Sequence, residues 1–127
     1  MADKLWRGNK NTARMRMSIQ GKYRRINIAK DVIRVIGMPR YIALRINPEM
    51  NSILVESSLE GNRPSFKVPD DLCQNIDRKM SIISTAFVMD VMNSNSLDPS
   101  KTYLVNGTYS EKNNAVVFDM KNAQVMK

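Results

Sequence analysis

The stretch that decides the fold is RINIAKDVIRVIG, residues Arg25–Gly37. Its first part alternates apolar and polar residues, with Ile26 and Ile28 on one side, which predicts a strand over residues 24–28. The apolar residues that follow recur at helical spacing, which predicts a short helix over residues 29–36 that ends at Gly37. Four β-branched residues make this helix dependent on packing, so a strand over the same residues is the competing interpretation.

Further strands are predicted on both sides of this stretch. Residues 14–19 alternate Arg and Ser with Met and Ile, which indicates a half-buried strand whose charges face solvent. Residues 20–23 form the turn into the next strand. Downstream, apolar runs over residues 41–46 and 52–55 flank a loop that contains Asn and Pro, which is a strong hairpin pattern.

The second half of the chain repeats this order weakly. Its predicted elements are strands over residues 65–68, 79–83, 102–106 and 115–119, a helix over residues 85–92 capped by Ser84, and a loop over residues 107–114. We interpret the chain as an internal duplication, with repeats over about residues 14–57 and 65–119; chance similarity of two short apolar patterns is the alternative. We therefore predict an α+β, mainly β fold: one domain over residues 13–127, forming a compact barrel from two degenerate repeats with short helices.

Residues 25–37, followed by the runs at 41–46 and 52–55, resemble an AbrB-like (SpoVT-AbrB) domain. That family has a strand, a basic turn, a second strand, a short helix with a basic residue, Leu-Gly and a terminal hairpin. The resemblance implies a swapped-hairpin β-barrel, in which the second repeat would fill the place of a partner subunit. The chain departs from the family at Ala29, where the family usually has proline.

The resemblance also implies DNA binding by arginines of the first turn and the helix. Carried over by position, it indicates Arg25 and Arg34, with Lys22 and Arg24 from the same turn. The second repeat carries acid at the equivalent turn, residues 69–71, so we do not expect a symmetric DNA-binding face.

Basic residues are concentrated in the first third of the chain. The net charge is +8, but residues 1–46 hold twelve Lys and Arg against two Asp, giving +10, and the remainder is slightly acidic. This segregation predicts one polyanion-binding face, to which the strand pattern adds Arg14 and Arg16. A charge bias that serves only solubility is the alternative for the face, and a solvated strand face is the alternative for each arginine. Residues 1–12 are polar and basic, and we expect a flexible arm there.

Several functional classes are excluded by composition. The chain has no His, a single Cys at position 73 and five Gly without a phosphate-binding pattern. His-dependent catalysis, zinc sites and an internal disulfide are therefore excluded, and we expect no enzyme, metal or cofactor. We also expect a cytoplasmic protein without a membrane segment, because no secretory signal or long apolar run is found.

Three functions remain open at this point. The leading hypothesis is a regulator that binds duplex DNA through Arg14, Arg16, Lys22, Arg24, Arg25 and Arg34. The second is an interaction module or inhibitor that docks the same basic face on an acidic protein. The third is a binder of small anionic ligands, such as nucleotides, in a pocket between the barrel halves. Any of the three is compatible with a homo-oligomer.

Overall fold

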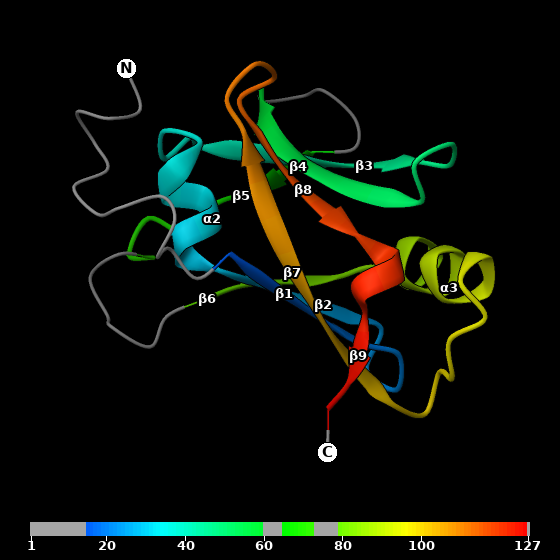
Figure 1. The fold of residues 1–127 in the computed structure, drawn as a ribbon. Helices are drawn as coiled ribbons and strands as arrows, with labels where there is room; N and C mark the ends of the chain where they lie inside the picture. Colours follow the sequence, from blue (N-terminus) through cyan, green and yellow to red (C-terminus); the bar gives the residue numbers. More distant parts are fainter. Residues whose placement is uncertain (1–14, 60–64, 73–78, 127) are drawn as a thin grey trace.

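A computed structural model describes residues 15–59, 65–72 and 79–126 and shows a mainly β, α+β fold (Figure 1). Eight antiparallel strands form a nearly closed barrel in the order β5-β3-β4-β8-β7-β1-β2-β6, which confirms the predicted fold class. The strands are β1 (Arg16–Gln20), β2 (Arg25–Ala29), β3 (Tyr41–Asn47), β4 (Ser52–Ser58), β5 (Ser65–Lys67), β6 (Lys79–Ile83), β7 (Thr102–Ser110) and β8 (Ala115–Asp119). A short strand, β9 (Gln124–Val125), pairs with β7. The helices are α2 (Lys30–Val35), α3 (Thr85–Ser94) and the 3-10 turn η1 (Met120–Asn122).

Strands from the two halves of the chain interleave around the barrel. β1 of the first half pairs with β7 of the second, and β5 of the second pairs with β3 of the first. The pairs β2–β6 and β4–β8 also join the halves. Because β2 and β6 run antiparallel and each leads into a helix, α2 and α3 lie at opposite ends of the barrel (Figure 1).

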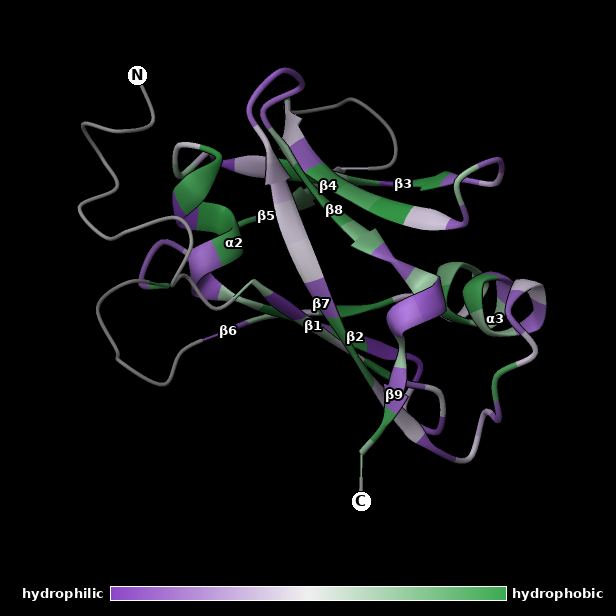
Figure 2. Ribbon diagram, viewed as in Figure 1, coloured by the Kyte–Doolittle hydropathy of each residue, from purple (hydrophilic) through white to green (hydrophobic). Residues whose placement is uncertain are grey.

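The barrel interior is filled by the apolar side chains of alternating strand positions. Met17, Ile28, Ile42 and Phe118 are among those fully buried. Figure 2 shows this pattern, with hydrophobic colour along the strands and hydrophilic colour at the turns. Burial of this kind is the main favourable term in folding, at about 25 cal/mol per Å² of apolar surface.

The end of α2 and the start of α3 lie where local sequence signals place them, whereas α3 continues to Ser94, two residues beyond the predicted end. α2 stops in a Schellman motif, in which the N–H groups of Gly37 and Met38 donate to carbonyls of the last turn at 3.1 and 3.0 Å. Gly37 has a φ of 101°, which a glycine adopts without steric cost, so the predicted stop is confirmed. α3 begins at Ser84, whose hydroxyl accepts a hydrogen bond from the Phe87 N–H at 3.3 Å, as predicted.

Some predicted boundaries are wrong. The loop predicted over residues 107–114 is mostly strand, since β7 continues to Ser110 and pairs with β8 along this stretch. Position 107 of this strand requires glycine, because a Cβ there would lie 2.7 Å from atoms of both Val116 and Phe118. The first turn lies one residue later than predicted, at residues 21–24.

Some expectations lie outside the described residues, among them the basic arm over residues 1–12 and the side chain of Arg14. Within the described residues, neither helix is long and apolar enough to cross a membrane.

Candidate nucleic-acid interface

The β1–β2 hairpin ends in a four-residue turn, Gly21–Arg24, at the α3 end of the barrel. The Tyr23 N–H donates to the Gln20 carbonyl and the Arg24 N–H donates to the Gly21 carbonyl, both at 3.2 Å. Lys22 and Tyr23 are exposed at the tip, and Arg24 is half-buried. With Arg25 at the start of β2, three cations and one aromatic ring follow one another in four residues.

Arg24 occupies a backbone conformation that arginine rarely adopts. Its φ is 52°, in the left-handed region where only a few per cent of non-glycine residues occur. The other two hairpin turns in the described chain also end in this conformation, but with asparagine, at Asn51 and Asn114. Asparagine tolerates it because its short polar side chain can bond locally. The Arg24 Nη1 donates to the Gly21 carbonyl, which offsets part of the conformational cost.

The turn is held against α3 and the loop that follows it. The Ser84 N–H donates to the Arg24 carbonyl at 2.9 Å, which joins the turn to the start of α3. Gly21 is required by close approach, because a Cβ there would lie 2.6 Å from the Met92 sulfur and would overlap the Pro99 carbonyl oxygen. The backbone of the basic tip is therefore fixed by its contacts with α3 and with the loop that follows α3.

The loop behind Gly21 is itself ordered by a carboxylate. Asp98 accepts hydrogen bonds from the Ser100 N–H at 2.9 Å and the Ser100 hydroxyl at 2.7 Å. These bonds favour the ionised carboxylate and hold the pKa of Asp98 below its usual value. They fix the residues on either side of Pro99, whose carbonyl faces Gly21.

Arg25 lies between the tip and the sheet. Its Cζ is 5.7 Å from the centroid of the Tyr23 ring, and the Lys22 Nζ is 5.8 Å from the same centroid. The Arg25 Nε is buried without a hydrogen-bond partner. Its neighbour across the β2–β6 pair is Ile83, which is 69% exposed.

The outward face of β1, β2 and β6 continues from the tip as a polar surface. The side chains that alternate with the core are Arg16, Ser18 and Gln20 on β1, Arg25, Asn27 and Ala29 on β2, and Lys79, Ser81 and Ile83 on β6. The Ser81 hydroxyl donates to the Asn27 Oδ1 at 2.5 Å, and the Asn27 Nδ2 donates to the Gln20 Oε1 at 3.4 Å. These three strands contain no Asp or Glu.

We call the cations of this surface and its tip the basic face; they are Arg16, Lys22, Arg24, Arg25 and Lys79. Arg16 is exposed and lies four residues from the turn along β1, about 13 Å at the usual rise of a strand. Lys79 was not among the predicted residues. It joins the face because β6 pairs with β2, which places Lys79 opposite Ala29. No local signal in the sequence specifies that pairing.

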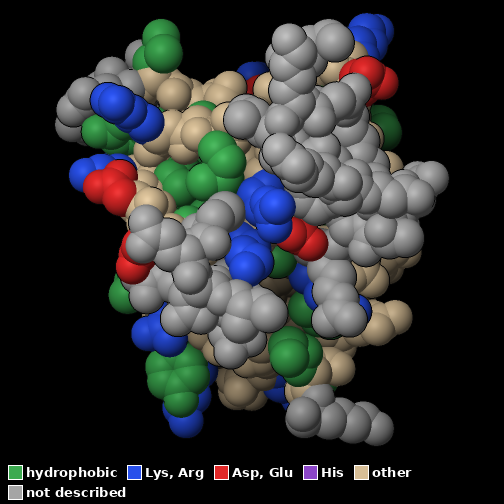
Figure 3. All heavy atoms as spheres, turned by 90° about the vertical axis from the view of Figure 1, so that its left-hand side faces the viewer, with side chains coloured by type: hydrophobic (Ala, Val, Ile, Leu, Met, Phe, Trp, Pro, Cys, Tyr) green, Lys and Arg blue, Asp and Glu red, His purple; other side chains and the backbone are tan. Residues whose placement is uncertain are grey.

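The structure does not bring Arg34 to this tip. Arg34 lies on α2, at the opposite end of β2, and its Nη1 is 3.9 Å from the Asp31 carboxylate. Figure 3 shows the molecule from the α2 side, where Lys and Arg side chains near the centre lie next to acidic side chains. The predicted residues therefore divide between the two ends of the barrel. Lys22, Arg24 and Arg25 lie together, and Arg34 is separate.

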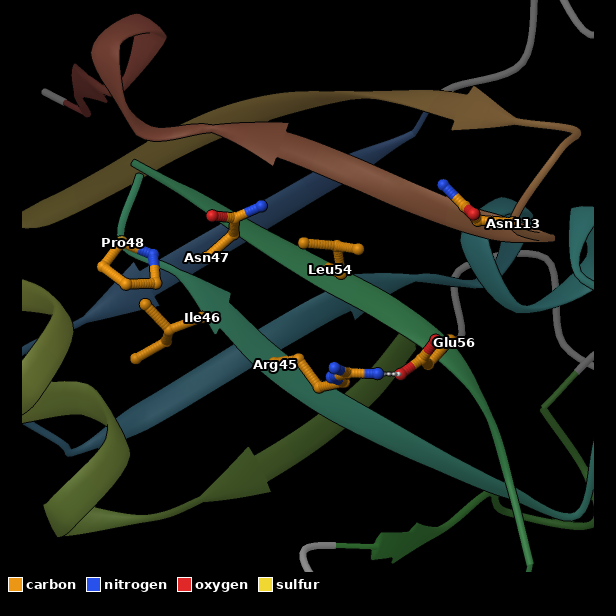
Figure 4. Close-up of a pocket in the computed structure, with 7 residues that line it drawn as sticks. All are labelled: Arg45, Ile46, Asn47, Pro48, Leu54, Glu56 and Asn113. Atoms are coloured by element: carbon orange, nitrogen blue, oxygen red, sulfur yellow. Dashed lines mark hydrogen bonds and ion pairs between the residues drawn. The ribbon is translucent and has the colours of Figure 1, made fainter. Parts of the chain in front are cut away.

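Among the described residues, two surface pockets lie away from the basic face. One, of about 480 Å³, lies on the outer side of β3 and β4, where Arg45 and Glu56 form a 3.0 Å ion pair beside Leu54 (Figure 4). The other, of about 300 Å³, is lined by Arg40, Tyr41, Lys67 and Asp70. Both carry acidic and basic groups together, and the interior between the barrel halves is filled by apolar side chains.

Comparisons of the chain with protein-family models, with characterised proteins and with solved structures find no match. The AbrB-like resemblance therefore stays a hypothesis. The function is inferred below from the chemistry of the basic face.

Proposed function

We propose that the protein is a non-catalytic DNA-binding regulator of AbrB-like type that binds duplex DNA through the basic face. The observation that carries this proposal is a continuous surface of three acid-free strands with five cations and an exposed tip. Guanidinium groups match phosphate oxygens in two-pronged hydrogen bonds, so Arg16 and Arg25 suit a nucleic-acid backbone.

The shape of the site suits a groove of DNA. The tip of the β1–β2 hairpin exposes Lys22 and Tyr23 at the α3 end of the barrel, while β1 and β2 stay paired with β7 and β6. The tip can therefore meet a groove of DNA, of which the major groove is roughly 12 Å wide, without the strands leaving the barrel. In this arrangement most cations contact phosphates, which positions the protein on the duplex without specifying its sequence.

The test is the salt dependence of binding to a labelled random-sequence duplex, followed by fluorescence anisotropy. Five phosphate contacts predict a slope of about −4.5 for log affinity against log salt, at roughly 0.9 per contact. The double variant Lys22→Ala/Arg25→Ala should reduce the slope to about −2.7. Excess unlabelled duplex should compete for binding in both proteins.

The matched control removes two cations from the other half of the chain. Lys112 and Lys121 are exposed and lie outside the basic face, so Lys112→Ala/Lys121→Ala should leave the slope unchanged. The proposal is wrong if the wild-type protein binds no duplex at 50 mM salt. It is also wrong if the salt slope of the control variant falls as much as that of the Lys22→Ala/Arg25→Ala variant.

A further inference from the structure

Tyr23 is a large aromatic residue left in solvent at the hairpin tip. It is 56% exposed, whereas Tyr41 and Tyr109 are half-buried and Tyr103 is buried. An aromatic side chain stabilises a fold chiefly by burying 150–250 Å² of surface, typical of such residues. Tyr23 forgoes most of that gain, and its position in the tip places the ring where a partner would first make contact.

The groups around Tyr23 suit a nucleotide. Lys22 and Arg25 both lie within the roughly 6 Å range for a cation beside an aromatic ring, so two positive charges stand next to the Tyr23 ring. An aromatic ring beside cations is the combination by which proteins hold unpaired nucleotides. The base stacks on the ring and the cations neutralise its phosphates.

Two features make the ring an effective platform. The turn is anchored through the hydrogen bond from the Ser84 N–H to the Arg24 carbonyl, so little backbone freedom is lost when a base stacks. Ile83 lies on the neighbouring strand, opposite Arg25, and is also exposed. It adds apolar surface next to the charged groups of the tip.

We propose that Tyr23 stacks on an unpaired nucleobase, so that the protein binds a duplex carrying an unpaired base more tightly than the same duplex fully paired. This inference rests on the proposed function, because the cations of the basic face must hold the flanking backbone. It goes beyond that function by naming the structural feature of the DNA that the tip recognises.

The experiment compares two labelled duplexes of one sequence, one fully paired and one with a single extra unpaired base. Wild-type protein should bind the second duplex roughly five- to 160-fold more tightly, the range for stacking of one base on an aromatic side chain. Tyr23→Phe should keep this preference. Tyr23→Ala and Tyr23→Leu should abolish it and leave affinity for the paired duplex within about twofold.

Direct stacking is read from a fluorescent base analogue, 2-aminopurine, at the unpaired position. Its fluorescence should change on binding wild-type protein and Tyr23→Phe, and should change less with Tyr23→Leu. Equal affinity of the wild-type protein for the two duplexes overturns the inference. The inference is also overturned if Tyr23→Leu lowers the affinity for both duplexes equally, since Tyr23 would then only position Lys22 and Arg25. Absence of binding to either duplex refutes the proposed function itself, which makes the two failures distinguishable.

Discussion

Replacing Arg24 by Asn separates the stability of the hairpin from its function. The φ of 52° at Arg24 is the conformation that the other two hairpins give to Asn51 and Asn114. A non-glycine residue held there costs about 1–2 kcal/mol, and less for asparagine. The variant loses the hydrogen bond from the Arg24 guanidinium to the Gly21 carbonyl, which contributes about 0.5–1.5 kcal/mol. These two effects oppose each other, so the free energy of unfolding should change by less than about 1 kcal/mol.

The same replacement should weaken DNA binding clearly. Loss of one phosphate contact makes the slope of log affinity against log salt shallower by roughly 0.9. The ratio of wild-type to variant affinity should therefore rise about eightfold when the salt concentration is lowered from 1 M to 0.1 M. Urea denaturation gives the first quantity and anisotropy over a salt series gives the second. Both use the full chain, so the two measurements are directly comparable.

A reciprocal variant is the control for backbone conformation. Asn51→Arg places arginine in the left-handed conformation of the β3–β4 hairpin, away from the basic face, and should lower the free energy of unfolding by about 0.5–1 kcal/mol. If Arg24→Asn is strongly destabilising, or binds DNA as tightly as wild type, then Arg24 serves the turn alone and the reasoning is refuted.

Three further predictions concern the fold. Gly107→Ala should lower the free energy of unfolding by about 1–3 kcal/mol, because its Cβ would overlap Phe118; Thr108→Ala, exposed on the same strand, should have little effect in thermal denaturation. Ser84→Ala removes the N-cap of α3 and should lower the free energy of unfolding by about 1 kcal/mol, whereas Ser84→Asp should retain most of the stability; urea denaturation measures both. Residues 1–57 alone should not fold as a monomer, since β1, β2 and β4 would each lose a partner strand; a well-dispersed NMR spectrum of a monomeric fragment would contradict this.

Local patterns in the sequence predicted most of the elements because their causes are local. Alternating apolar residues identified β1, β2 and the β3–β4 hairpin, and cap residues identified the end of α2 at Gly37 and the start of α3 at Ser84. β7 was predicted too short for a physical reason. Its residues 107–110 are polar or glycine, and they are strand only because β8 pairs with them.

The candidate site was predicted less completely, because it depends on which strands meet. Lys22, Arg24 and Arg25 are adjacent in sequence, so their proximity follows from the turn itself. Lys79 reaches the same face only through the β2–β6 pair, 54 residues after Arg25. Arg34 was assigned to the face by the AbrB-like resemblance, but α2 begins only after β2 has crossed the barrel, so Arg34 lies at the opposite end from the tip.

The order strand–strand–helix–strand–strand occurs twice along the described chain, as the hypothesis of an internal duplication expects. Each of β1 to β4 in the first half pairs with a strand of the second half. Each helix is followed by a residue of positive φ, Gly37 after α2 and Ser96 after α3. Two copies arranged in this way would place their first turns at opposite ends of the barrel. The first of these turns is basic and leads into β2, whereas the second carries Asp70 and Asp71, both exposed. Asp70 shares a pocket with Arg40 and Lys67, so charges of both signs offset one another at that end, whereas the tip at Lys22–Arg25 carries cations alone. A duplex would thus be attracted more strongly to the tip, and a single orientation on DNA is the consequence we expect.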